Sequence, residues 1–252
     1  MAKGNPGADS SSPVTNDLIN TATQQFGQSP SFWGRYFTGP TTSGSVEYRH
    51  GSESPVLAQH NIRLLPVARQ TANVGGSQQQ GVSDAQSNVE DILDTFGQAY
   101  LTSQGGEFLF FLDVEGSPST GSPSLSLDYY LGWAQTLVSY SRSQTNNAVT
   151  LLPCVYARQG DNETWNCLVS ANGQGTNCNG AWVARYYYSG CDMPNWDDSI
   201  VLPSVTLPFD VLLWQYAENC CEGSIDCNQT NPNLDTQTLL LNRLILPPAA
   251  AS

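Results

Sequence analysis

Two acidic residues stand at the end of the most apolar stretch of the sequence. Asp113 and Glu115 follow the run Phe-Leu-Phe-Phe-Leu at 108–112, and only Val114 separates them. Alternate residues of a strand share one face, so both carboxyl groups point the same way, about 7 Å apart along the strand. Burying such a pair is costly, and two close carboxylates raise the pKa of one of them. The pattern predicts a general acid and its partner, the pair that glycoside hydrolysis requires. The structural alternative is a strand-end pair that binds an arginine or caps a loop.

Two more acidic residues occupy comparable places. Asp9 ends the first predicted strand, in Gly-Ala-Asp at 7–9, and Asp226 lies in Ile-Asp-Cys-Asn at 225–228. Active sites of α/β barrels lie where the strands end at the carboxyl side. We therefore expect Glu115, Asp113, Asp9 and Asp226 to form one acidic, catalytic centre.

Aromatic and polar residues recur at later strand ends. Trp182, Arg185 and Tyr186 lie on the sixth predicted strand, and Trp214 and Gln215 lie on the seventh. Aromatic faces stack on sugar rings, while carboxylates and amides bind hydroxyl groups. This mixture indicates a carbohydrate cleft, although each aromatic residue taken singly is more typical of a core.

The charge balance argues against several classes of partner. The 252 residues include 9 basic and 22 acidic ones, a net charge of −13, and 39% are hydrophobic. Nucleic acids and anionic membrane surfaces require basic patches, which this chain lacks. No stretch approaches the roughly 20 apolar residues of a membrane span. We expect neither a nucleic-acid partner nor a transmembrane segment, and the sequence leaves the oligomeric state open.

Short apolar runs alternate with amphipathic stretches, which is typical of a parallel sheet covered by helices. The predicted strands are 7–11, 32–37, 62–70, 107–115, 149–157, 181–187 and 211–216, with a short eighth at 224–228. The predicted helices are 15–26, 54–60, 82–101, 126–143 and 163–171, whereas 188–208 shows no helical periodicity. We predict one α/β domain over residues 1–252. It is a TIM-type barrel of eight strands and about five helices, with an irregular, loop-rich C-terminal third. An open doubly wound sheet is the competing architecture.

All seven cysteines lie in the C-terminal half, and their spacing matches no zinc site. Loop-rich surroundings favour disulfides for most of them and hence an oxidising compartment. Cys154 is the expected free thiol, because it lies inside the apolar run 151–156. Residues 1–7 hold no apolar signal segment. We expect a secreted or extracellular protein whose signal was removed or whose export uses another route.

The order of these motifs resembles two related families. Gly-x-Asp, Leu-Asp-Val-Glu, Trp-Val-Ala-Arg-Tyr, Trp-Gln-Tyr and Ile-Asp-x-Asn follow one another between residues 7 and 228. This order is similar to glycoside hydrolase family 25, the lysozyme-type muramidases, and to the glycoside-hydrolase-like domain of unknown function 1906. The latter shares the strand end Arg35-Tyr36 and a helix opening like that at 81–85.

The resemblance implies roles for the acidic residues. Glu115 corresponds to the general acid, and Asp113 to the residue that positions the 2-acetamido group or stabilises the developing cation. Asp9 and Asp226 correspond to outer acidic residues of the cleft. The implied reaction is hydrolysis of the β-1,4 bond after N-acetylmuramic acid, in an eight-stranded barrel with five helices, without a metal or another cofactor.

The third predicted strand departs from the muramidase pattern. It ends in Arg69-Gln70 instead of a Gly-x-Tyr-His-Phe type of sequence. The function predicted from the sequence is therefore hydrolysis of β-1,4 bonds in peptidoglycan or another amino-sugar polymer. The alternative is a catalytically inactive barrel that binds glycan or serves as a surface or assembly module. The expected substrate-binding residues are Arg35, Tyr36, Arg69, Gln70, Tyr156, Arg185, Tyr186, Trp214 and Gln215.

Overall fold

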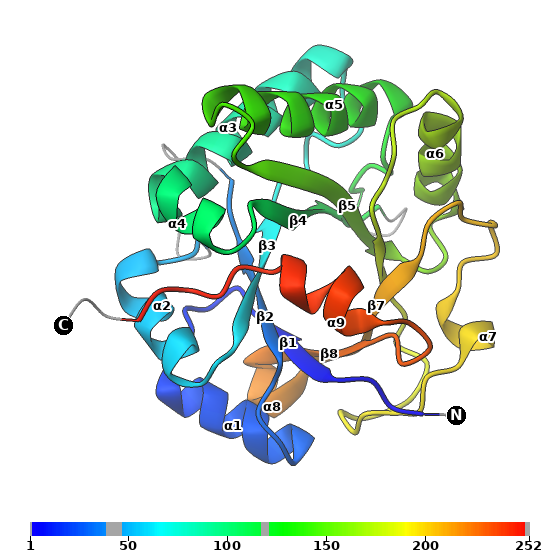
Figure 1. Ribbon diagram of the computed structural model, residues 1–252. Helices are drawn as coiled ribbons and strands as arrows, with labels where there is room; N and C mark the ends of the chain where they lie inside the picture. Colours follow the sequence, from blue (N-terminus) through cyan, green and yellow to red (C-terminus); the bar gives the residue numbers. More distant parts are fainter. Residues whose placement is uncertain (1, 39–46, 117–120, 250–252) are drawn as a thin grey trace.

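The protein forms a closed eight-stranded barrel (Figure 1). The computed structural model describes residues 2–38, 47–116 and 121–249. Neighbouring strands along the chain are neighbours in the barrel, and the last strand closes it against the first. The strands are β1 (Pro6–Asp9), β2 (Phe32–Tyr36), β3 (Arg63–Ala68), β4 (Glu107–Val114), β5 (Thr150–Arg158), β6 (Ala181–Ala184), β7 (Val211–Asn219) and β8 (Ile225–Thr230). The predicted TIM-type barrel is confirmed.

One strand runs against the others. β1 to β7 are parallel, but β8 pairs antiparallel with both β7 and β1. The predicted parallel sheet therefore holds for β1 to β7, whereas β8 makes the barrel sheet mixed. The reversal brings the start of β8 to the edge where the other strands end. In the register of β1 and β8, Asp226 lies opposite Asp9.

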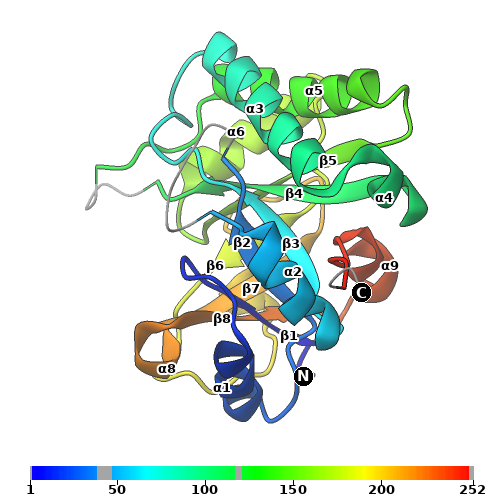
Figure 2. The ribbon, with the colours of Figure 1, turned by 90° about the vertical axis from the view of Figure 1, so that its left-hand side faces the viewer.

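Five helices of ten or more residues cover the barrel, as predicted. The described residues also form four shorter helices, nine in all. Figures 1 and 2 show α3 and α5 packed together beside β4 and β5, with α1 and α8 on the opposite side. The helices are α1 (Asn16–Phe26), α2 (His50–Gln59), α3 (Gln78–Phe96), α4 (Gln98–Ser103), α5 (Leu127–Gln144), α6 (Asn162–Gly173), α7 (Asp198–Val201), α8 (Cys220–Gly223) and α9 (Thr236–Leu239), followed by the 3-10 turn η1 (Leu241–Arg243).

The predicted helix at 82–101 consists of two helices. α3 begins earlier, where the Ser77 side chain accepts a hydrogen bond from the backbone N–H of Gln80. It ends at Gly97, whose φ of 74° is easy for glycine only and separates α3 from α4. Gly81 and Gly132 let α3 and α5 approach closely, because a Cβ at either would lie within 2.2 Å of a carbonyl oxygen of the other helix.

Apolar side chains pack on both faces of the barrel sheet. Phe32, Leu65, Leu109 and Phe111 belong to a buried cluster inside it, and a larger cluster lies between the strands and the helices. Leu240 and Leu244, from the segment of α9 and η1, join the interior cluster. The C-terminal segment thus closes the barrel end opposite the strands' carboxyl edge, which leaves that edge as the open mouth.

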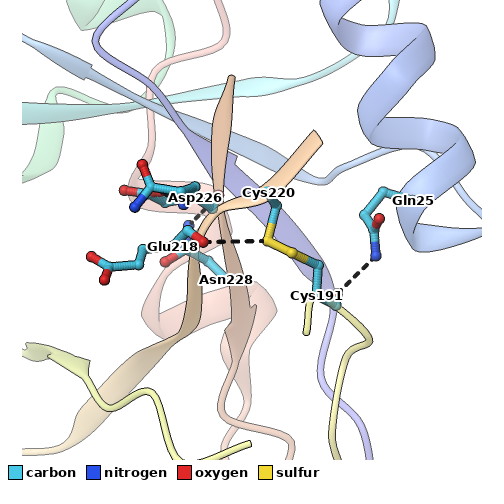
Figure 3. The surroundings of a disulfide bond; sticks show 7 residues. Gln25, Cys191, Glu218, Cys220, Asp226 and Asn228 are labelled. Carbon is cyan, nitrogen blue, oxygen red and sulfur yellow. Dashed lines mark hydrogen bonds between the residues drawn. A yellow bond between two sulfur atoms is a disulfide. The ribbon is translucent and has the colours of Figure 1, made fainter. Parts of the chain in front are cut away.

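The C-terminal third is irregular, as predicted, with only one-turn helices between its strands. α7 lies between β6 and β7, and α8 joins β7 to β8. In the α8 turn, Asn219, Cys221 and Glu222 all have positive φ angles of 53–62°. This is the left-handed region, which is unfavourable for residues other than glycine. A disulfide between Cys191 and Cys220 ties the turn to the loop after β6 (Figure 3).

The prediction of several disulfides was wrong. Cys191–Cys220 is the disulfide of the structure, and the other five cysteines are free thiols. Cys154 is free and buried inside the barrel, as expected. Most of the other free thiols are buried as well, where cysteine packs as a small apolar side chain. One disulfide still fits the expected extracellular location.

No helix in the described part of the chain is long and apolar enough to cross a membrane.

The disulfide should contribute measurably to stability. It closes a loop of 29 residues, and restricting the unfolded chain to this extent is worth about 3–4 kcal/mol. We expect Cys191→Ser to lower the free energy of unfolding by about this amount in urea titrations. The control is Cys221→Ser, which removes the half-buried free thiol next to Cys220. Equal stability of the two variants would contradict this structural role.

Candidate active site

The four predicted acidic residues meet in one pocket at the mouth of the barrel. Asp9, Asp113, Glu115 and Asp226 all line it. The other lining residues are Gly34, Tyr36, Val67, Tyr156, Trp182 and Gln215. The pocket thus draws on the ends of several strands, as a barrel active site does.

Strand alternation decides which side chains enter the pocket. Asp113 points inward, Val114 packs in the outer cluster, and Glu115, the first residue beyond β4, points inward again. On β2, Gly34 leaves the space that Asp9 occupies, because a Cβ there would lie 2.7 Å from the Cβ of Asp9. A glycine at this place in the strand is therefore part of the site's construction.

Asp9 is held by two side-chain amides. Its Oδ2 accepts hydrogen bonds from Gln215 Nε2 at 3.0 Å and Asn228 Nδ2 at 2.7 Å. Trp182 Nε1 donates to Asn228 Oδ1, which fixes the orientation of that amide. The hydroxyl groups of Tyr156 and Tyr186 donate to Gln215 Oε1 and so fix the orientation of the Gln215 amide. Burial, followed by the charge of Asp226, nevertheless raises the pKa of Asp9 well above its usual value.

Asp113 is the second deeply buried carboxyl group of the pocket. Its side chain is only 3% exposed, and burial together with the nearby charge of Glu115 raises its pKa to about 8. Two groups oppose the shift: the charge of Arg69 and a long hydrogen bond of 3.5 Å from Thr71 Oγ1. At neutral pH, Asp113 therefore holds a proton in the free protein. Glu115, two residues on, is exposed.

Asp226 is fixed by the turn that precedes β8. The backbone N–H of Asn219 donates to Asp226 Oδ1 at 2.7 Å. Burial raises the pKa of Asp226, and the charges of Glu218 and Glu115 add to this effect. Figure 3 shows Glu218 and Asp226 close to the disulfide that holds the turn. Glu218, near the end of β7, is thus a fifth acidic group near the mouth.

Six of the nine expected substrate-binding residues lie in or beside the acid pocket. Tyr36, Tyr156 and Gln215 line the acid pocket. Arg69 is exposed at its edge, with its guanidinium 5.3 Å from the ring centre of Tyr36. Arg185 and Tyr186 line a neighbouring groove.

The remaining three expected residues lie outside the pocket. Arg35 is fully buried behind the barrel wall, where its Nε lies 2.7 Å from Glu53 Oε2 in an ion pair. Trp214 packs against Trp196 on the outer side and donates to the carbonyl of Arg185. Gln70 is buried, and its amide donates to the carbonyl of Thr38. Arg35 precedes the inward-pointing Tyr36, and Trp214 precedes the inward-pointing Gln215. Because neighbouring residues of a strand face opposite sides, Arg35 and Trp214 point outward.

One pocket residue, Trp182, and two residues that act on the pocket's acids, Asn228 and Glu218, were not among the expected substrate-binding residues. Trp182 and the small Ala184 of β6 share the inward face of the strand. Because alternate strand residues share a face, the even spacing from Trp182 to Tyr186 could have indicated that Trp182 points inward. Asn228 was part of the Ile-Asp-x-Asn motif, but its contact with Asp9 depends on the reversed strand. Glu218 gave no signal, because β7 was expected to end at 216.

No group of three or more histidine, cysteine, aspartate or glutamate side chains among the described residues has an arrangement that could hold a metal ion. The acid pocket offers carboxyl, amide and aromatic side chains.

Comparison with known proteins gives fold likeness only. No family model and no curated protein matches the sequence. A solved structure of an uncharacterized protein from B. stearothermophilus is similar with a TM-score of 0.69 and 20% identity, over 96% of this chain and 100% of that one. A family 25 glycosyl hydrolase from Bacillus anthracis has a TM-score of 0.51 and 14% identity, over 93% and 92%. A Tat-secreted protein of Mycobacterium tuberculosis has a TM-score of 0.49 and 15% identity, over 91% and 95%. The barrel is thus similar in fold to a family 25 glycosyl hydrolase.

The buried Asp113 should make stability depend on pH. Its pKa is about 8 in the folded protein and near 3.8 when unperturbed, so between these values the folded state binds a proton that the unfolded state lacks. Stability should therefore fall as pH rises from about 4 to 8, by up to about 1.4 kcal/mol per pH unit for this group.

We expect Asp113→Asn to be more stable than the native protein at pH 8 and to depend less on pH, as measured by urea unfolding between pH 5 and 8. Asp94→Asn, at an exposed position of α3, is the matched control and should leave the pH dependence unchanged. An Asp113→Asn profile parallel to the native one would show that Asp113 is ionised throughout this range.

Proposed function

We propose that this protein is a glycoside hydrolase that cleaves β-1,4 bonds in peptidoglycan or another amino-sugar polymer. The observation that carries the proposal is the pair of unlike carboxyl groups at the barrel mouth. Asp113 is buried with a pKa of about 8, and Glu115 is exposed where a substrate can reach it. Glycoside hydrolysis uses two carboxyl groups whose different environments keep one of them protonated and the other ionised. The fold likeness to a family 25 glycosyl hydrolase agrees with it.

In this proposal the pair shares one proton. Asp113 holds it in the free protein, because its charged form is disfavoured by burial and by Glu115. A 2-acetamido N–H that donates to Asp113 favours its carboxylate. Substrate binding then moves the proton to Glu115, which donates it to the leaving oxygen. The Asp113 carboxylate positions the acetamido group or stabilises the positive charge that develops on the sugar. A water molecule then adds to the anomeric carbon and gives its proton to Glu115, which completes the hydrolysis.

The other pocket residues hold the sugar in this proposal. Tyr36 offers an aromatic ring at the pocket, while the buried Trp182 and Tyr156 form its wall, and the Tyr156 hydroxyl is anchored on Gln215. Asp9 and Asp226 are the outer acidic groups that bind hydroxyl or amide donors. A sugar that lies across the mouth of this pocket can therefore contact an aromatic ring and charge-assisted hydrogen-bond partners together.

A catalytically inactive glycan-binding barrel is the alternative. Such a module could neutralise its acidic pair with arginine. In the described part of the chain, however, neither Arg69 nor Arg185 forms an ion pair with these carboxylates, and Arg35 is paired with Glu53 outside the pocket. This observation favours the enzyme.

The test is hydrolysis by Glu115→Gln. We expect at least a hundredfold loss of reducing-end release from peptidoglycan glycan or an N-acetylglucosamine polymer, because general acids contribute about 10²–10⁴-fold. Native activity should also decline above about pH 8, where the pair loses its shared proton. The matched control is Glu107→Gln, since Glu107 is an exposed glutamate at the other end of the same strand. Equal rates for native protein and Glu115→Gln would contradict the proposal, and glycan binding without any native hydrolysis would favour the alternative.

A further inference from the structure

A second groove adjoins the acid pocket at the mouth of the barrel. It lies over the ends of β4, β5 and β6 and has a volume of about 790 Å³. This is within the usual range of roughly 300–1,000 Å³ for ligand sites. Its lining comes from 116 and 122–124 after β4, from 158–163 after β5, and from 184–186 at the end of β6.

The groove and the acid pocket share structural elements. The Tyr186 ring lines the groove, while its hydroxyl donates to Gln215 Oε1 in the acid pocket at 2.6 Å. Gly116, another groove residue, directly follows Glu115. A chain of sugars held in the acid pocket can therefore continue into the groove past Tyr186.

Two arginines distinguish this groove from the rest of an acidic protein. Arg158 and Arg185 are two of only nine basic residues in the chain, and both are exposed. Arg158 pairs in register with Ala184, so the two arginines stand on adjoining strand ends. Neither guanidinium forms an ion pair within the described residues. That of Arg185 lies 5.6 Å from the ring centre of Tyr187, which helps to hold it in place.

The acidic residues of the groove leave these cations available. Asp161 caps α6, and both of its carboxylate oxygens accept hydrogen bonds from Ser124 or Thr164. Glu163, in the first turn of α6, is the remaining acidic group of the lining. Among the described residues, the groove therefore presents two guanidinium groups that form no ion pair, beside the carboxylate of Glu163.

We infer that this groove binds a carboxylate-bearing sugar unit of the substrate, next to the unit held in the acid pocket. The inference rests on the proposed glycan hydrolysis and narrows the substrate to an acidic glycan. Guanidinium groups bind carboxylates through paired, charge-assisted hydrogen bonds. The face of Tyr186, which is 36% exposed, provides a surface for the sugar ring.

The net charge of −13 does not oppose this local contact. At physiological salt, charges separated by more than about 8 Å are largely screened, so the adjacent arginines dominate the interaction with a bound carboxylate. The contact itself should weaken as salt rises, because both arginines are exposed.

The carboxylate has two plausible chemical sources, a uronic acid or a lactyl ether. We would measure binding of three soluble oligosaccharides in the Glu115→Gln background, so that no substrate is consumed. The first alternates N-acetylglucosamine with glucuronate, the second is lactyl-bearing peptidoglycan glycan, and the third is a neutral N-acetylglucosamine oligomer. The added variants are Arg158→Gln and Arg185→Gln, alone and together. Arg142→Gln, which removes an exposed arginine near the start of β5 at the opposite end of the barrel, is the control.

We expect the double variant to weaken binding of at least one acidic oligosaccharide by about tenfold, and each single variant by about threefold. The neutral oligomer and the Arg142→Gln control should be unaffected, and the acidic oligosaccharide that responds identifies the source of the carboxylate. Equal losses on neutral and acidic oligosaccharides, no loss on either, or no binding at all would overturn the inference. Arginine-dependent binding without hydrolysis by the native protein would support the inference while the proposed hydrolysis fails.

Discussion

The open end of the barrel buries carboxyl groups that form no ion pair with a described residue. Asp9 and Asp113 are at most 9% exposed, and the ion pair of the described residues, Arg35–Glu53, lies on the other side of the barrel wall. Amides and hydroxyls support these acids, but burial still raises both pKa values. Keeping such costly groups at the open end lowers the stability of the fold, and perturbed carboxyl groups of this kind are typical of functional sites.

The neighbouring structure serves to hold these acids in place. Two amides, each fixed in orientation by an aromatic side chain, orient Asp9. The reversed β8 brings Asp226 opposite Asp9, and the disulfide-bound turn before β8 supplies the N–H that fixes Asp226. Positive φ angles in that turn show that its conformation is imposed by its surroundings, the disulfide among them. The irregular C-terminal third thus has a definite task, which is to complete the mouth.

The sequence predicted side-chain orientation best where the two-residue repeat of a strand applies. Alternation along β4 correctly placed Asp113 and Glu115 on one face, because that period is fixed by the strand itself. The same rule, applied to Arg35 beside Tyr36 and to Trp214 beside Gln215, would have placed one of each pair outside the barrel. The direction of β8 could not be read, since an apolar pattern is the same in both directions. Disulfide pairing and the proton on Asp113 depend on three-dimensional proximity and burial, which spacing alone does not contain.

The protonation of Asp113 is the central claim, because the shared proton, the pH-dependent stability and the roles of the pair depend on it. A carboxyl-detected NMR titration of protein labelled at aspartate tests it directly, with the Asp113 signal assigned by its loss in Asp113→Asn. We predict a signal that titrates near pH 8. A value for Asp113 below about 5, within the ordinary range for aspartate, would contradict the account.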